Sequence, residues 1–114
     1  MKTQYLEVVT PDVDGVCAAY SAALRVELSP PVPALGGART ARLQDGSHLG
    51  VRAPLRESEL PVVRPYWLVP DIQAALVAAE KAGARVAVPP MPIPGYGTCA
   101  IYLIGGNEHG LWQL

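Results

Sequence analysis

The sequence predicts an α+β fold built from two similar modules, each in the order strand, helix and three further strands. Two observations predict it: a set of residues repeated at a constant spacing, and two alanine-rich segments with helical periodicity at equivalent places in the repeat. The chain has 114 residues, of which 50% are hydrophobic. This length suits one domain that hides roughly two-thirds of its unfolded surface. We expect a single domain with module one at 4–52, a linker at 53–63 and module two at 64–114.

The repeat is collinear along the whole chain. Thr10-Pro11-Asp12-Val13 is echoed by Val69-Pro70-Asp71-Ile72, and an alanine-rich segment follows each of them. One such match arises by chance, but an ordered series indicates a tandem duplication. The further matching pairs lie 60 positions apart and are 25–30 with 85–90, Leu43 with Leu103, Gly46 with Gly106, and Gly50 with Gly110.

Module one opens with a strand at about Tyr5–Thr10, which Pro11 and Asp12 end. Asp12 is a suitable N-cap for a helix that runs to about Leu24. Helical spacing gives this helix one apolar stripe, made of Val13, Val16, Cys17, Tyr20 and Leu24. Short strands are then expected near Arg25–Leu28, Ala38–Leu43 and His48–Arg52.

Module two repeats this order after a polar, proline-flanked linker. A strand at Arg64–Val69 leads to a helix near Ile72–Lys81, which Gly83 ends. The proline-rich segments Ser29–Leu35 and Pro89–Gly97 occupy matching places, and we expect them to be semi-rigid loops. The remaining strands are expected at Arg85–Val88, Thr98–Ile104 and Gly110–Gln113.

Composition excludes several classes of function. Nine basic and ten acidic side chains give a net charge of −1, which provides no field for binding nucleic acid or an anionic membrane. No apolar stretch approaches the ~20 residues of a membrane span, and no secretory signal is evident. A cytoplasmic protein is expected. Cys17 and Cys99 lie in apolar surroundings without metal-site spacing, so buried, inert thiols are predicted rather than a disulfide or a redox role.

Strand alternation sorts the side chains onto two faces of the predicted sheet. One face is aliphatic and suits packing against the two helices. The other carries arginines beside tyrosines and a tryptophan, which favours a concave face for planar or anionic ligands. A merely solvated face of an antiparallel sheet is the open alternative. The predicted binding residues are Tyr5, Glu7, Arg42, His48, Arg52, Arg64, Tyr66, Tyr102 and Trp112, with Thr40 on the same face.

Three segments resemble the vicinal-oxygen-chelate superfamily, the glyoxalase, bleomycin-resistance and dioxygenase-like proteins. They are 10–14 (Thr-Pro-Asp-Val-Asp), 94–98 (Pro-Gly-Tyr-Gly-Thr) and 106–113 (Gly-Asn-Glu-His-Gly-Leu-Trp-Gln). The resemblance covers about Gln4–Leu114. It implies paired βαβββ modules forming a cupped, eight-stranded mixed sheet with two helices on its outer face, usually in a homodimer whose halves are sometimes exchanged between subunits.

The same resemblance indicates where a metal would be held. Enzymes of the superfamily place ligands in the first and last strand of each module, and the matching positions here are Tyr5, Gly50, Arg64 and Gly110. Glycine offers no ligand atom, and arginine does not release its proton to bind a metal. One phenol does not hold a divalent ion, so neither a metal nor another cofactor is expected.

Three functional hypotheses remain open at this stage. The first is a non-metal protein that binds a small molecule and sequesters an aromatic or glycopeptide-like compound, as antibiotic-resistance relatives do. The second is an enzyme with metal-free acid–base chemistry by Glu7 and His48, or with an atypical metal. A structural ion pair between Glu7 and Arg52 or Arg64 competes with that role. The third is a dimeric interaction protein whose cup is vestigial.

Overall fold

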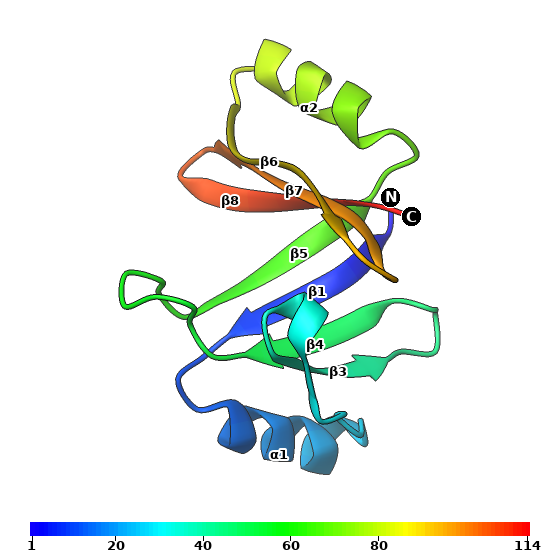
Figure 1. Ribbon diagram of the computed structural model, residues 1–114, viewed down its shortest axis with the longest axis vertical. Helices are drawn as coiled ribbons and strands as arrows, with labels where there is room; N and C mark the ends of the chain where they lie inside the picture. Colours follow the sequence, from blue (N-terminus) through cyan, green and yellow to red (C-terminus); the bar gives the residue numbers. More distant parts are fainter. The chain divides into compact units, whose positions relative to one another are not determined.

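The computed structural model describes residues 1–114 and contains two α-helices and eight strands, which confirms the α+β class. The chain divides into two compact units (Figure 1). The N-terminal unit is Tyr5–Val63, and the C-terminal unit joins Met1–Gln4 to Arg64–Leu114. Neither helix is long and apolar enough to cross a membrane. The division into modules and linker stays a prediction, although the linker residues group with the N-terminal unit.

The N-terminal unit contains one helix and a small mixed sheet. Its central pairing is parallel, between β1 and β4, and β3 lies antiparallel to β4 on the far side. A short β2 pairs with β3 at the sheet edge. The elements are β1 (Thr3–Val9), α1 (Val13–Leu24), β2 (Pro31–Val32), a 3₁₀ turn (Pro33–Leu35), β3 (Ala38–Arg42) and β4 (His48–Arg52).

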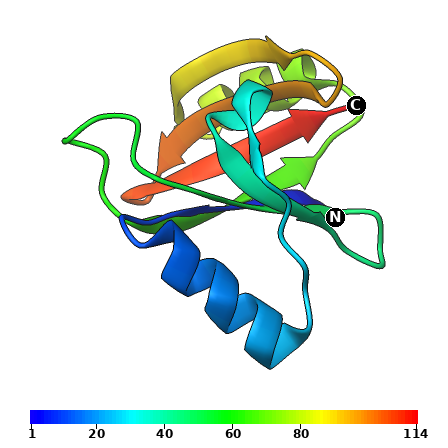
Figure 2. The same ribbon diagram turned by 60° about the horizontal axis from the view of Figure 1, so that its bottom comes forward.

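Helix α1 begins and packs as its sequence predicts. The Asp12 side chain accepts a hydrogen bond from the Gly15 N–H and so caps the first turn. Cys17 of this helix is buried among aliphatic side chains of β1, β3 and β4. Helix α1 therefore covers one face of this sheet (Figure 2). Leu24 was predicted to join this stripe, but it is 62% exposed because the helix ends there and Arg25 turns into the left-handed conformation.

The C-terminal unit has the same plan. Its elements are β5 (Val62–Leu68), α2 (Ile72–Lys81), β6 (Arg85–Ile93), β7 (Gly97–Ile104) and β8 (Asn107–Gln113). The strand order is β5-β8-β7-β6, with β5 parallel to β8. The Leu68 N–H donates to the Lys2 carbonyl at 2.7 Å, so the first residues of the chain extend this sheet at β5. The hydrogen-bonded order of all strands is therefore β2-β3-β4-β1-β5-β8-β7-β6.

One predicted strand and one predicted loop are wrong. Residues 25–28 form no strand, and the chain is irregular there. It pairs with β3 first through the Ser29 N–H, which donates to the Thr40 carbonyl at 2.7 Å, and then at β2. The loop predicted at Pro89–Gly97 instead continues β6 as far as Ile93, with two register shifts. Prolines lack the N–H of a ladder bond, and β6 tolerates them because it is the edge strand of the sheet.

The side-chain phase of β7 also differs from the repeat-based prediction. In module one Thr40 is opposite Gly50, whereas in module two Ile101, and not residue 100, is opposite Gly110. The β7–β8 turn is the two-residue Gly105-Gly106 turn with positive φ, one residue shorter than its counterpart at 44–46. A one-residue change of register moves every side chain to the other face.

Candidate functional site

The candidate site lies on the face of the N-terminal sheet that α1 does not cover, called here the helix-free face. Side chains of β1, β3 and β4 stand on it in rows, because neighbouring strands are in register. Tyr5, His48 and Arg42 form the first row, and Glu7, Gly50 and Thr40 form the second. The sequence-predicted residues Tyr5, Glu7, Arg42, His48 and Arg52 are therefore brought together on one face.

Arg52 is the centre of a buried ion-pair network. Its Nε donates to Glu7 Oε2 at 2.9 Å, and its two terminal nitrogens donate to the two Glu59 oxygens at 2.8 Å each. The forked hydrogen bond to Glu59 raises the pKa of the Arg52 guanidinium, against the opposing effect of burial. The predicted structural ion pair of Glu7 with an arginine is confirmed, and its partner is Arg52.

Glu59 is a member of this network that the sequence did not reveal. It lies in the polar linker, where no periodicity marks it, and Glu59 Oε1 also accepts from the Leu55 N–H at 2.8 Å. The segment after β4, seen as the green loop in Figures 1 and 2, is thus fastened to the helix-free face by one carboxylate.

The space above Gly50 is filled by the ring of Tyr5. A Cβ added at Gly50 would lie 2.5 Å from Tyr5 Cζ and closer still to the phenol oxygen. Tyr5 itself is 4% exposed. The two family ligand positions of module one are therefore occupied together by one aromatic side chain.

The C-terminal unit repeats this arrangement. A Cβ at Gly110 would lie 2.5 Å from Tyr66 Cγ and 2.7 Å from the Pro65 carbonyl oxygen. The fourth family position, Arg64, is buried and donates to Glu108 Oε1 at 2.7 Å. Glu108 stands 60 positions after His48 in the repeat, so the duplication was the signal that could have pointed to it.

These residues do not fit a divalent metal. No group of three or more His, Cys, Asp or Glu side chains is arranged to hold an ion. Rings fill the space at Gly50 and Gly110, and the remaining family position, Arg64, is engaged by a carboxylate.

Tyr66 and Trp112 are packed as core residues of the C-terminal unit. Their rings meet edge to face with centroids 5.7 Å apart, and the Trp112 indole N–H donates to the Tyr96 carbonyl at 3.1 Å. They are 6% and 3% exposed. Their predicted ligand-stacking role remains untested, and it would require these rings to leave their present partners.

Tyr102 lies on the opposite face from the one predicted. It packs against the cluster of Ile72, Leu76 and Leu111 beneath α2, and its ring stacks on His109 at 5.2 Å. The shorter β7–β8 turn causes this, because it shifts the register by one residue. His109 lies on the same side of the sheet as Tyr102.

Arg42 and His48 are the most open of the predicted residues on the helix-free face. Arg42 is exposed, while His48 is half-buried and bonded to no other side chain. Burial lowers the pKa of His48, and the charge of Arg42 lowers it further. Both groups are therefore available to a molecule arriving from solvent.

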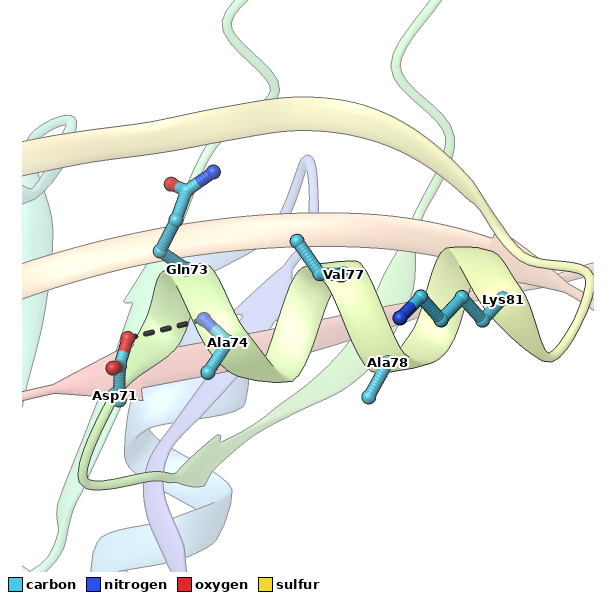
Figure 3. A pocket seen from close by; sticks show the side chains of 6 residues that line it. All are labelled: Asp71, Gln73, Ala74, Val77, Ala78 and Lys81. Atoms are coloured by element: carbon cyan, nitrogen blue, oxygen red, sulfur yellow. Dashed lines mark hydrogen bonds between the residues drawn. The ribbon is translucent and has the colours of Figure 1, made fainter.

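A shallow depression lies along the outer surface of α2, apart from the helix-free face. Figure 3 shows the side chains of Asp71, Gln73, Ala74, Val77, Ala78 and Lys81 that line it. Within it the Asp71 carboxylate accepts from the Ala74 N–H at 3.0 Å and serves as the helix cap. These side chains come from one helix and its cap, and none belongs to the predicted site.

Comparison with solved structures gives the same architecture. A hypothetical protein from Bacillus halodurans matches with a TM-score of 0.78 and 14% identity, over 99% of this chain and 94% of that one. A variant of the methylmalonyl-CoA epimerase of Streptomyces coelicolor, in complex with 2-nitronate-propionyl-CoA, matches with a TM-score of 0.74 and 18% identity, over 99% and 94%. The chain therefore has the same fold as these proteins.

Methylmalonyl-CoA epimerase from Mycobacterium tuberculosis also shares this fold. Its TM-score is 0.73 at 18% identity, over 97% of this chain and 86% of that one. No protein-family model matches the sequence, and no curated protein matches it either. At these identities the likeness establishes the fold alone, and function rests on the residues of this chain.

Proposed function

We propose that this protein has the vicinal-oxygen-chelate fold and is a metal-independent small-molecule-binding protein, which sequesters an aromatic or glycopeptide-like compound without changing it. The observation that carries the proposal is the pair of tyrosines over glycines. Tyr5 fills the space above Gly50, and Tyr66 fills the space above Gly110. In both modules a packed ring thus lies where the family resemblance implies a metal-binding side chain.

The alternative is an enzyme that uses Glu7 and His48 as an acid–base pair. Glu7 is held by Arg52 at 2.9 Å, inside a network that also holds Glu59. This leaves His48 as the titratable group open to a ligand on the face. One accessible imidazole, without a partner that orients it, favours binding over acid–base catalysis.

Native mass spectrometry of the purified protein, with and without EDTA, is the test. We propose a homodimer, located in the cytoplasm, and expect a dimer mass without bound metal. We also expect a 1:1 complex per chain with at least one aromatic compound from a glycopeptide and planar-carboxylate panel, unaffected by EDTA. Propionyl-CoA is included because a structurally similar epimerase is known in complex with a CoA ester.

Two results would contradict the proposal. Stoichiometric Mn²⁺ or Co²⁺ retained by the protein, and removed by EDTA together with ligand binding, would make a metalloenzyme the leading hypothesis. Conversion of a bound compound, seen as a mass change of the released ligand that His48→Asn abolishes, would favour the acid–base enzyme.

A further inference from the structure

Arg42 and His48 are cross-strand neighbours on the helix-free face. They are directly opposite in the β3–β4 register. The Leu43 N–H donates to the Ser47 carbonyl at 2.8 Å in the adjacent pair, so Arg42 and His48 occupy a non-hydrogen-bonded site. Side chains at such a site approach most closely, with Cβ atoms about 5 Å apart. Their side chains therefore share one small area at the open end of β4.

No acidic side chain neutralises this pair. Arg39, Arg52 and Arg64 each donate to a carboxylate, whereas Arg42 forms no ion pair. The nearest acid in sequence, Asp45, accepts from the Ser47 N–H and hydroxyl and is held in the hairpin turn. A guanidinium without a carboxylate partner, beside an imidazole, therefore suits a face that receives an anion.

Tyr5 is the third member of the row that contains Arg42 and His48, and it closes the inner end of that row. Tyr5 is opposite His48 on β1, and its ring covers Gly50. Exposure therefore falls along the row, from Arg42 in solvent through the half-buried His48 to the buried Tyr5. The donors for an anionic group therefore lie at the open end of this row, and the packed Tyr5 ring closes its other end.

We infer that Arg42 and His48 form a binding site for an oxyanion, the carboxylate or phosphate of the small molecule that the helix-free face holds. The guanidinium fork matches the two oxygens of such a group, and the imidazole N–H adds a third donor. This inference rests on the proposed function, because it assigns the acidic group of the ligand. It uses none of the buried family positions.

The surroundings of His48 favour its neutral form when no anion is bound. The groups that face it are Arg42 from β3 and Tyr5 from β1, with Asp45 engaged in the turn. Burial and then Arg42 lower the pKa of His48. An anion placed between the two side chains opposes both effects, because its negative charge favours the imidazolium form. Oxyanion binding is therefore expected to raise the pKa of His48.

Nuclear magnetic resonance of ¹³C-labelled histidine tests this directly. The chain has two histidines, and His109 lies on the helix side of the other unit, where it serves as an internal reference. Benzoate and inorganic phosphate are the probes and distinguish a carboxylate site from a phosphate site. We expect one of them to shift the His48 resonances saturably and to raise its pKa, while His109 does not move.

Arg42→Gln and Arg39→Gln form a matched pair of variants. They remove the same charge from the same strand on opposite faces, since Arg39 reaches Asp14 on the α1 side. Arg42→Gln is expected to weaken anion binding about tenfold or more, as for loss of a hydrogen bond between charged groups. Without anion it should also raise the pKa of His48. Arg39→Gln should leave both properties unchanged.

Two outcomes would overturn the oxyanion site: no saturable shift of His48 with either probe, or equal effects of the two variants. Failure of the proposed function looks different. In that case no aromatic compound is retained in the native mass spectrum, yet the probes still shift His48 and Arg42→Gln still weakens their binding.

Discussion

Replacing Gly50 by alanine tests whether the tyrosine ring over this glycine is a fixed part of the fold. The new Cβ would lie 2.5 Å from Tyr5 Cζ, whereas non-bonded heavy atoms normally sit at ~3.5 Å. The ring would have to retreat by about 1 Å into a site where it is 4% exposed. Overpacking of this kind costs about 1–3 kcal/mol of unfolding free energy.

A double-mutant cycle isolates the cause. The three nearest atoms to the added Cβ all belong to Tyr5, so Tyr5→Ala should remove the whole clash. Tyr5→Ala alone should cost about 3–5 kcal/mol, as for a large buried aromatic side chain. In that background Gly50→Ala should be neutral or slightly stabilising, because alanine suits a strand better than glycine does. The expected coupling is about 1–3 kcal/mol.

The assay is urea unfolding, followed by tryptophan fluorescence and circular dichroism. The free energies of unfolding of the four proteins are compared provided that their m-values agree. Gly110→Ala with Tyr66→Ala is the matched cycle in module two. There the Pro65 carbonyl oxygen also lies 2.7 Å from the new Cβ, so Tyr66→Ala should relieve only part of the cost. Additive effects of Gly50→Ala and Tyr5→Ala would refute the reasoning.

Three further predictions concern the network, the core and the open histidine. Arg52→Gln should lower the free energy of unfolding by about 3–5 kcal/mol, because it leaves buried carboxylates without a cation. Arg39→Gln removes a more exposed ion pair and should lower it by at most about 1 kcal/mol. Chemical denaturation of the two variants measures this difference. Trp112→Ala should cost about 3–5 kcal/mol whether or not ligand is present, and an unchanged melting temperature would contradict its placement in the core. The pKa of His48 is lowered below 6.5 in the fold, so its contribution to stability is present above that pH and lost below it. His48→Asn should therefore lose less stability than the wild type between about pH 6.5 and pH 5, and parallel profiles would count against the shift.

Much of the local structure follows from the sequence. The boundaries of α2 at Ile72 and Lys81 and those of β4 at His48 and Arg52 agree with the predictions. The N-cap at Asp12 acts as expected, and Asp71 caps α2 in the same way. These features depend on residues close together in the chain, where periodicity and capping chemistry decide the outcome.

The candidate site was predictable in part. Strand alternation correctly brought Tyr5, Glu7 and His48 to one face, because β1 and β4 pair without a shift. It failed at Tyr102, where a turn shorter by one residue reversed the faces. The burial of these side chains could not be predicted either. An arginine or tyrosine on a sheet face has the same sequence pattern whether it contacts solvent, a carboxylate or a glycine.

The sequence by itself determined the α+β class and both helices, and it showed the internal repeat that pairs Gly50 with Gly110. The tertiary structure alone decided that Arg52 reaches Glu59, that rings cover both glycines, and that Arg42 and His48 stay open. The physical reason is the separation along the chain over which each interaction acts. Helix propensity and capping act within about one turn of the chain, whereas register, packing and ion pairing join residues that only the folded sheet brings together.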